Sequence, residues 1–193
     1  GRDGPVVRNV ATTHLLDRLA ETLGEKCLEV PVGFKYISKE MREANALLGG
    51  ESSGGMTIKG HIPGKDGVLA ASLIVSMIGT TNKSMQDLVE EVLDITGKLY
   101  QEEENIPYQG EMRANLTEKF QSCDLEQIAG FPVIETSHLD GAKFILEDDN
   151  WVLVRFSGTE PVLRLRSEAD SAEKARNLIR GIRDIFSIEE NDL

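Results

Sequence analysis

The sequence predicts an α/β domain followed by a smaller α+β domain, on the basis of three observations. In the first half, short apolar runs alternate with stretches of helical spacing, as in βαβ units built around a parallel sheet. An acidic run at 101–105 then interrupts this pattern. Beyond it, strand-like segments and tight turns predict an antiparallel sheet, followed by one long helix. We therefore expect a three-layer αβα domain at 1–101, and a small domain with an antiparallel sheet and helices at 102–193, with the acidic run as linker.

In the first half, apolar runs at 4–10 and 26–32 predict two strands. Four helices are expected from their start signals: from Thr12 or Thr13 to Gly24, at 38–48 with Ser38 as cap, at 66–78 with Asp66 as cap, and from the pair Ser84 and Asp87 to residue 99. The third helix contains GVLAASLIVSMIG, which is too short to cross a bilayer. We expect this helix to be buried.

In the second half, the segments PYQGEMRANL, FPVIETSHLDGAKFILEDDNWVLVRF and PVLRLRSEA are predicted to be strands. Tight turns are expected at 139–141 and at 148–150. A final helix follows Asp170 and Ser171, and its inward residues are expected to be Ala175, Leu178, Ile179, Ile182 and Phe186.

The charge balance limits the classes of partner. The 193 residues include 21 Lys and Arg against 33 Asp and Glu, which gives a formal net charge of −12. This charge argues against nucleic acid or a membrane surface as the main partner, because both are anionic. An anionic ligand is expected only where arginine and backbone N–H groups locally outweigh the acidic surface.

Cysteine usage and the first residues indicate the compartment. The two cysteines, Cys27 and Cys123, do not make a disulfide framework and lack the spacing of a zinc site. The first ten residues lack the apolar core of a signal peptide. We therefore expect a cytoplasmic protein.

The segment RFSGTEP, at 155–161, carries more polar groups than a hairpin turn requires. Arg155 offers a planar guanidinium, and Ser157 and Thr159 offer hydroxyls, all of which suit a phosphate group. If Gly158 has a positive φ, the successive backbone N–H groups of this turn curve into an anion-binding nest. The alternative is a structural hairpin whose arginines pair with surface acids. Strand alternation places Arg164 and Arg166 on the face opposite Leu163 and Leu165, so one of these two arginines can face the same pocket.

The loop LLGGESSGGMTIKGHIPGKDG, at 47–67, is the second unusual stretch. Glu51 and Ser53 point to one side if the backbone is extended, and a carboxylate with a hydroxyl suits vicinal sugar hydroxyls. Lys65 can neutralise a phosphate. The alternative is a mobile surface loop. His61 taken alone is better interpreted as structural or solvated than as catalytic.

Four segments together resemble the α-D-phosphohexomutase superfamily, the phosphoglucomutase and phosphomannomutase group. They are PVGFKYI at 31–37, GGESSGG at 49–55, HIPGKDG at 61–67 and RFSGTEP at 155–161. Their order and spacing resemble the third and fourth domains of that family over essentially the whole chain. The resemblance implies an αβα third domain that binds the sugar and an α+β fourth domain that binds phosphate.

The resemblance also implies the roles of individual residues. Glu51 and Ser53 fall at positions that contact sugar hydroxyls, and Lys65 and Lys35 fall at positions that line the same cleft. The positions that bind the non-reacting phosphate are Arg155, Ser157, Gly158, Thr159 and Arg164. Two departures are mild: Ser52 stands where the family often has Glu, and Phe156 stands where a smaller residue is common.

The resemblance implies a whole enzyme that interconverts hexose 1-phosphate and hexose 6-phosphate, with Mg²⁺ and hexose 1,6-bisphosphate as cofactors. The family's phosphoserine loop and its Asp-x-Asp-x-Asp magnesium motif do not occur in this chain. We therefore expect the chain to bind hexose phosphate, to hold no cofactor, to need the N-terminal domains of the same polypeptide and to be inactive alone. The alternatives are a free-standing, non-catalytic sugar-phosphate binding module, and a scaffold in which both loops are only turns.

Overall fold

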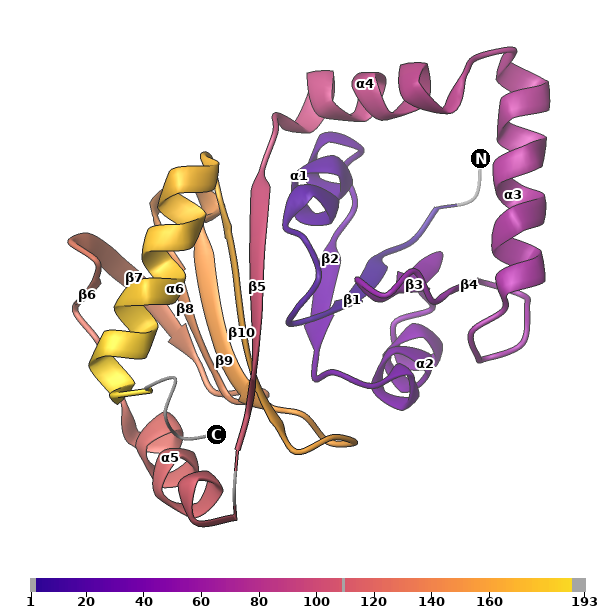
Figure 1. The fold of residues 1–193 in the computed structure, drawn as a ribbon. Coiled ribbons are helices and arrows are strands. Elements are labelled where there is room, and N and C mark those ends of the chain that lie inside the picture. Colours follow the sequence, from indigo (N-terminus) through magenta and orange to yellow (C-terminus); the bar gives the residue numbers. More distant parts are fainter. Residues whose placement is uncertain (1–2, 109, 189–193) are drawn as a thin grey trace. The chain divides into compact units, whose positions relative to one another are not determined.

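The computed structural model describes residues 3–108 and 110–188, and it divides into two compact units. Unit 1 comprises Gly1–Lys98 and unit 2 comprises Leu99–Leu193. Unit 1 is an α/β sheet with helices on its faces, and unit 2 is an antiparallel sheet with helices (Figure 1), so the predicted fold class is confirmed. Over the described ranges, no helix is long and apolar enough to cross a membrane.

The sheet of unit 1 has four strands in the order β2-β1-β3-β4. Their bounds are Val6–Asn9 for β1, Cys27–Val30 for β2, Leu48–Gly50 for β3 and Met56–Ile58 for β4. β1 is parallel to both β2 and β3, whereas β4 is antiparallel to β3. The central strand β1 therefore lies between its two parallel neighbours, and the carboxyl ends of all three meet at one edge of the sheet.

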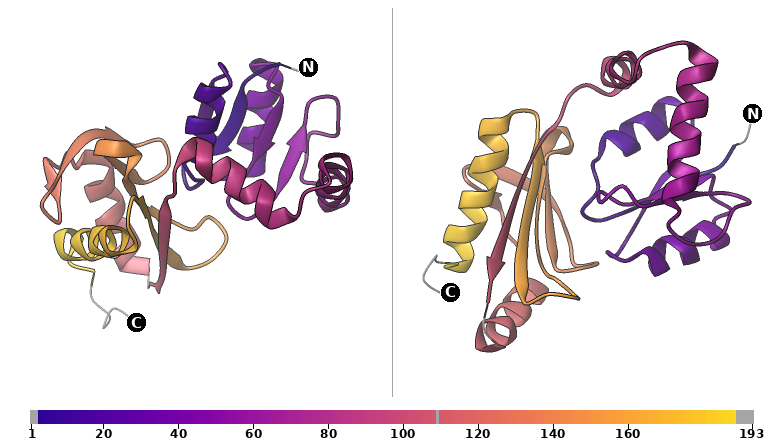
Figure 2. Two further views of the ribbon diagram at one scale, coloured as in Figure 1. Left: turned by 90° about the horizontal axis from the view of Figure 1, so that it is seen from above. Right: turned by 45° about the vertical axis from the view of Figure 1, so that its right-hand side comes forward.

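Helices cover both faces of this sheet. α1 (Leu15–Thr22) and α4 (Met85–Thr96) lie on one side, and α2 (Phe34–Glu43) lies on the other (Figures 1 and 2). The predicted cap pair of Ser84 and Asp87 is confirmed as a capping box. The first helix begins slightly later than predicted, with His14 at its N-cap position and the Thr13 hydroxyl accepting from the Leu15 N–H at 3.1 Å.

The prediction of a second helix at 38–48 is wrong in position. α2 begins four residues earlier, and Ser38 lies buried inside it, donating its hydroxyl to the Pro63 carbonyl at 2.9 Å instead of capping. The helix ends early because the chain takes a positive φ of 53° at Asn45. The residues that follow form β3, so the predicted glycine-rich loop contains two paired strands.

α3 (Gly67–Thr81) is capped as predicted, since the Asp66 carboxylate accepts from the N–H groups of Val68 and Leu69. The prediction that this helix is buried is wrong, because none of its residues is buried. It stands beside the edge strand β4 and not over a face of the sheet (Figure 1). An aliphatic helix at a sheet edge has too few neighbours to cover its apolar side chains.

A buried ion cluster joins three elements of unit 1. Arg8, on β1, is 3% exposed, and its guanidinium donates to both carboxylate oxygens of Asp17, on α1, at 2.6 and 2.9 Å. It also pairs with Glu29 on β2. Burial opposes the charged form of Arg8, but the contacts with the two carboxylates raise its pKa overall. This cluster holds α1 over β1 and β2.

Unit 2 contains an antiparallel sheet in the order β5-β10-β9-β8-β7-β6. The strand bounds are Tyr100–Pro107, Gln127–Ile128, Phe131–Ser137, Ala142–Leu146, Trp151–Phe156 and Val162–Ala169 for β5 to β10, with a short 3-10 turn, η1, at Glu147–Asp149. The final helix, α6 (Ala172–Phe186), is capped by the Ser171 hydroxyl, and all five of its predicted inward residues are buried in the core.

Two secondary-structure predictions fail in unit 2. The acidic run 101–105, predicted as a linker, lies within β5 and pairs with β10 along its whole length. Residues predicted as a strand after Pro107 form α5 (Gly110–Ser122). Good helix formers dominate this segment, and Leu116 and Phe120, spaced i and i+4, reach the core from one helical face.

Gly141, in the turn between β7 and β8, is expected to tolerate no side chain. Its φ is +83°, and a Cβ would lie 2.2 Å from the Val154 carbonyl oxygen and 2.9 Å from the Arg155 Cα. Gly130 has the same φ of +83°, but nothing lies within 4 Å of its Cβ position. Replacing Gly130 by Ala should cost about 1 kcal/mol of strain, whereas Gly141→Ala should cost about 3 kcal/mol or more.

Urea denaturation followed by tryptophan fluorescence measures this difference, because the single tryptophan, Trp151, is buried in unit 2. Equal destabilisation by the two alanines would contradict the importance of the close backbone approach at Gly141.

Candidate functional site

The candidate site of unit 1 forms where three parallel strands end. Asn9 ends β1, Gly33 follows β2, and Glu51 follows β3. Open α/β sheets bind ligands beyond the carboxyl ends of their strands, because loops and free backbone groups gather there. The glycine-rich segment that the sequence singled out thus lies at the edge of the sheet where a ligand is expected.

The carboxylate of Glu51 is the centre of this site. Its side chain is only 6% exposed. One oxygen, Oε1, accepts from the Asn9 amide and from the Gly33 backbone N–H, both at 3.2 Å. The other, Oε2, lies 2.6 Å from the Lys65 ammonium. A buried carboxylate is costly unless donors surround it, and here both oxygens are satisfied.

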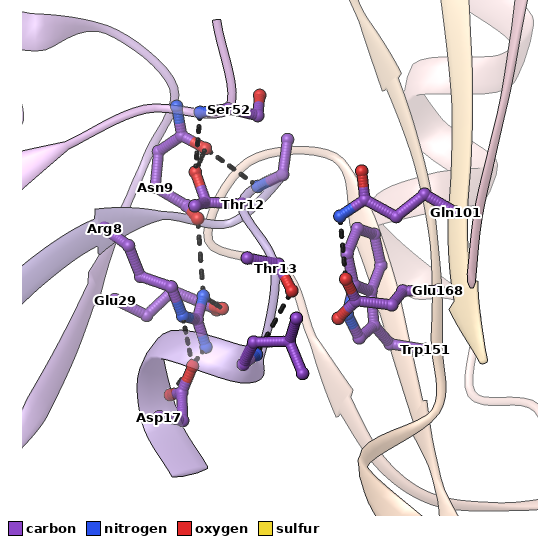
Figure 3. A network of polar contacts seen from close by, with 12 residues as sticks. Arg8, Asn9, Thr12, Thr13, Asp17, Glu29, Ser52, Gln101, Trp151 and Glu168 are labelled. Atoms are coloured by element: carbon purple, nitrogen blue, oxygen red, sulfur yellow. Dashed lines mark hydrogen bonds and ion pairs between the residues drawn. The ribbon is translucent and has the colours of Figure 1, made fainter. Parts of the chain in front are cut away.

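Asn9 and Thr12 support Glu51 from β1 and the turn after it. The Asn9 side-chain oxygen accepts from the Ala11 N–H at 3.0 Å and from the Thr12 hydroxyl at 2.9 Å. The Thr12 hydroxyl oxygen in turn accepts from the Ser52 N–H at 3.1 Å (Figure 3). The sequence prediction missed both residues. The signal that could have identified them is the presence of polar residues at the carboxyl end of the first predicted strand and directly after it.

The assumption of an extended backbone at Glu51 and Ser53 is wrong. The Gly54 N–H donates to the Glu51 carbonyl at 2.9 Å, so residues 51–54 form a tight turn between β3 and β4. Gly54 supplies the positive φ, +86°, that closes this turn. Ser53 is exposed at the turn, whereas the Glu51 side chain points into the protein.

The structure brings Lys65 to Glu51 but not Lys35. The Lys65 ammonium also lies 5.7 Å from the centre of the Phe34 ring, and its aliphatic stem packs on the backbone at Gly55. Lys35 is exposed on α2, with its ammonium 4.8 Å from the ring of its neighbour Tyr36. Of the two predicted cleft lysines, one is therefore fixed by ion pairing and the other faces solvent.

His61 is tied to the start of α3. Its Nε2 lies 2.8 Å from the Asp66 carboxylate, whose other oxygen caps the helix. The hydrogen bond from the Leu69 N–H, followed by the contact with His61, lowers the pKa of Asp66. This geometry agrees with a structural role for His61.

In unit 2, the predicted phosphate turn is built around the Ser157 hydroxyl. Ser157 is buried, and its Oγ accepts from the N–H groups of Thr159 and Glu160, both at 3.3 Å. Its own N–H donates to the Val162 carbonyl at 2.9 Å. Gly158 is exposed and does not have a positive φ. The predicted nest of three successive free N–H groups is therefore wrong. The N–H groups of Thr159 and Glu160 donate to the Ser157 hydroxyl, and the Ser157 N–H donates across the hairpin.

Carboxylates neighbour both predicted arginines. Arg155, with 11% of its side chain exposed, donates through Nε to Asp140 at 3.1 Å. Arg164 pairs with Glu160, and its Nη1 lies 3.9 Å from Glu103. The Arg164 Nε is buried without a hydrogen-bond partner. These ion pairs agree with the alternative of a structural hairpin whose arginines pair with surface acids. They still leave guanidinium N–H groups that can donate to a further anion.

Neither cysteine has the environment of a nucleophile. Burial, followed by the nearby charge of Asp17, raises the pKa of the Cys27 thiol to about 12. Burial also raises the pKa of Cys123. Within 3–108 and 110–188, no group of three His, Cys, Asp or Glu side chains is placed to hold a metal ion.

Replacing Asn9 by Ala is expected to destabilise unit 1 by about 2 kcal/mol, because it removes one of the two donors to the buried Glu51 Oε1 and the acceptor of the buried Thr12 hydroxyl. Ser52→Ala is the matched control, since Ser52 joins the network through its backbone. Amide hydrogen exchange at Val7, in the buried strand β1, measures the stability of unit 1. Equal exchange rates in the two variants would show that the Asn9 side chain does not support the site.

Two family models match the chain. The alpha/beta/alpha domain III of phosphoglucomutase/phosphomannomutase matches residues 1–95, and the C-terminal domain of the same family matches residues 111–185. A phosphoglucomutase/phosphomannomutase from Thermococcus kodakarensis is 34% identical over 91% of this chain and 36% of its own length. A phosphoglucosamine mutase from Methanocaldococcus jannaschii is 28% identical over 92% of this chain and 38% of its own.

Solved structures of the same superfamily share the fold. A structure from Thermus thermophilus, of a protein assigned as a phosphomannomutase, is 32% identical with a TM-score of 0.74, over 97% of this chain and 37% of its own. An N-acetylphosphoglucosamine mutase from Aspergillus fumigatus, solved with GlcNAc-6P and magnesium, is 13% identical with a TM-score of 0.62, over 93% of this chain and 40% of its own.

The chain therefore spans less than half the length of these relatives. Its two units match the third and the last domain of one family in the order of that family. The chain belongs to the phosphoglucomutase/phosphomannomutase family of the α-D-phosphohexomutase superfamily.

Proposed function

We propose that this chain is the sugar- and phosphate-binding part of a phosphohexomutase that interconverts hexose 1-phosphate and hexose 6-phosphate. Family membership supports this proposal, as do the mutase names of its relatives. The chain spans 36–38% of those relatives' length, which supports assigning the complete reaction to a longer polypeptide. In this proposal, domains N-terminal to the chain supply the phosphoserine and the metal site, and the chain alone is inactive.

The observation that carries the proposal is the buried carboxylate of Glu51 at the carboxyl edge of the parallel strands. A carboxylate only accepts hydrogen bonds, and sugar hydroxyls donate them. Because Asn9 and Gly33 hold Glu51 in one orientation, little side-chain entropy remains to be lost when a sugar binds. Ser53, exposed on the same turn, offers a hydroxyl that can both donate and accept.

Lys65 balances the charge of Glu51 and is half exposed. Its ammonium has three donors, so it can keep its contact with Glu51 while it donates to a sugar hydroxyl or to a phosphate. We assign Lys35 a weaker role, at the solvent-exposed margin, where it attracts the anionic ligand.

In unit 2, we propose that the non-reacting phosphate binds at the turn 157–159. The terminal amino groups of Arg155 have no partner within the part of the chain that the structure describes, since its contact with Asp140 uses Nε. A phosphate can therefore bind two guanidinium nitrogens without displacing Asp140. The Gly158 N–H and the Thr159 hydroxyl supply neutral donors, and Ser157 shapes the turn.

Arg164 joins the phosphate site by exchanging partners in this proposal. Its present partner Glu160 is exposed and lies on the turn itself. An exposed ion pair contributes little stability, so replacing it by a phosphate is inexpensive.

Magnesium and hexose 1,6-bisphosphate are the proposed cofactors of the complete enzyme, which we expect to be cytoplasmic. Among the described residues, no group of three His, Cys, Asp or Glu side chains is placed to hold a metal ion. In this proposal, the chain contributes binding and orientation of the sugar phosphate.

Backbone amide shifts of the labelled 193-residue chain test the proposal during titration with glucose 6-phosphate, mannose 6-phosphate and glucosamine 6-phosphate. Saturable shifts at 51–53 and 157–159 are expected, and the order of affinities indicates the substrate. Silence at both segments with all three sugars would refute binding by this chain.

The Arg155→Ala variant is expected to weaken binding of glucose 6-phosphate by about 2–3 kcal/mol, because it removes a charge-assisted, bidentate contact. Arg180→Ala, on an exposed position of α6, is the matched control for loss of one positive charge. Calorimetric or NMR titration gives both dissociation constants, and an unchanged constant for Arg155→Ala would remove it from the site.

The Glu51→Gln variant is expected to weaken binding of hexose phosphate about tenfold while leaving inorganic phosphate unaffected, since Glu51 is proposed to contact only the sugar. The two ligands are titrated into the same sample of the variant. Equal losses for both ligands would show that Glu51 does not contact the sugar hydroxyls.

A further inference from the structure

A cavity of unit 1, of about 230 Å³, lies away from Glu51. It is lined by the second half of α2, by the end of β4 and by the segment 59–63. In the antiparallel pair, Gly50 lies opposite Met56 and Leu48 lies opposite Ile58. Glu51 therefore follows one end of this pair, whereas Ile58, which lines the cavity, lies at the other end. We call this cavity the α2–β4 pocket.

The α2–β4 pocket is locally positive in an acidic protein. The chain has a net charge of −12 with 33 acidic residues, but no Asp or Glu lines the pocket among the residues that the structure describes. Arg42, on α2, and Lys59, directly after β4, line it together with His61, whose imidazole contacts Asp66. Neither Arg42 nor Lys59 has an ion pair or a side-chain hydrogen bond within the described ranges. Two unpaired cations therefore border one small cavity.

Apart from Asn45, the remaining lining is apolar or has its side-chain hydroxyls hydrogen-bonded. Met41, Ile58 and Ile62 supply apolar surface. The hydroxyls of Ser38 and Thr57 are occupied, since they donate to the carbonyls of Pro63 and Ile62 at 2.9 and 2.8 Å. An apolar cavity with a few cationic groups at its border is the usual form of a site for a small organic anion.

We propose that the α2–β4 pocket binds a small organic anion, in which a carboxylate or phosphate group contacts Arg42 and Lys59 and an apolar group lies against Met41, Ile58 and Ile62. This site is separate from the proposed hexose phosphate site and does not depend on it. A purely structural role for Arg42 is the competing explanation, because a cation in the last turn of α2 stabilises the helix dipole. That role does not account for Lys59, which lies outside any helix.

The test titrates the labelled full chain with benzoate, phenyl phosphate and inorganic phosphate at constant ionic strength set by sodium chloride. Benzoate and phenyl phosphate separate a carboxylate from a phosphate ligand, and inorganic phosphate lacks the apolar part. Saturable shifts are expected at the amides of Asn45, Ile58, Gly60 and Ile62 with at least one organic probe, and weaker ones with inorganic phosphate. Amide shifts at 157–159 report binding at the proposed phosphate site of unit 2, so they are analysed separately.

Arg42→Ala and Lys59→Ala are each expected to raise the dissociation constant about tenfold, which corresponds to one charge-assisted contact. Lys39→Ala is the matched control, because Lys39 is an exposed cation of α2 that pairs with Glu43 outside the pocket lining. Absence of saturable shifts with both organic probes would overturn the proposal, as would unchanged constants in both pocket variants. A loss of stability in Arg42→Ala without a loss of affinity would support the helix-dipole explanation instead.

Discussion

The arrangement of unit 1 depends on the need to satisfy one buried carboxylate. Glu51 is placed below the surface, and its oxygens require donors from the end of β1, from the residue after the β2 loop and from the segment before α3. These donors are distant in sequence, so the carboxylate fixes the ends of the strands with respect to each other. A charge held in this way is costly to bury but already oriented, as the proposed contact with a sugar hydroxyl requires.

In unit 2, carboxylates accompany the arginines beside the turn 157–159. Asp140 and Glu160 contact Arg155 and Arg164 and reduce the repulsion between cations near the turn. The pair of Arg155 with Asp140 is the more buried one, and it fixes the orientation of the Arg155 guanidinium. The pair of Arg164 with Glu160 is more exposed and therefore weaker, so Arg164 can more readily change its partner. The buried Ser157 hydroxyl stabilises the turn itself, so the turn keeps its shape independently of a ligand.

Charge is distributed unevenly over unit 1. The cluster of Arg8, Asp17 and Glu29 neutralises a buried cation and fixes α1 on the sheet. In the α2–β4 pocket, by contrast, the cations have no acidic partner among the described lining residues. The same unit thus contains a compensated structural cation and, beside a cavity, cations that no acidic side chain of the described lining compensates.

The sequence by itself determined the fold class, the family and most of the helix starts. Asp66, Ser84 and Ser171 cap their helices through local hydrogen bonds, and local signals of this kind are visible in a short window of sequence. The inward residues of α6 followed from helical spacing alone. Glu51, Lys65, Arg155 and Arg164 were found as site candidates because charged residues among glycines and strand ends are conspicuous.

Only the tertiary structure decided which of these groups meet. The acidic run 101–105 is a strand because β10 supplies its partner, although its composition disfavours a strand. Asn9 and Thr12 support Glu51 through contacts between residues far apart in the sequence, and no local pattern encodes such a contact. The exposure of α3 could not be predicted either. Hydropathy shows that the side chains of this helix are apolar, but the tertiary structure determines which elements pack against them.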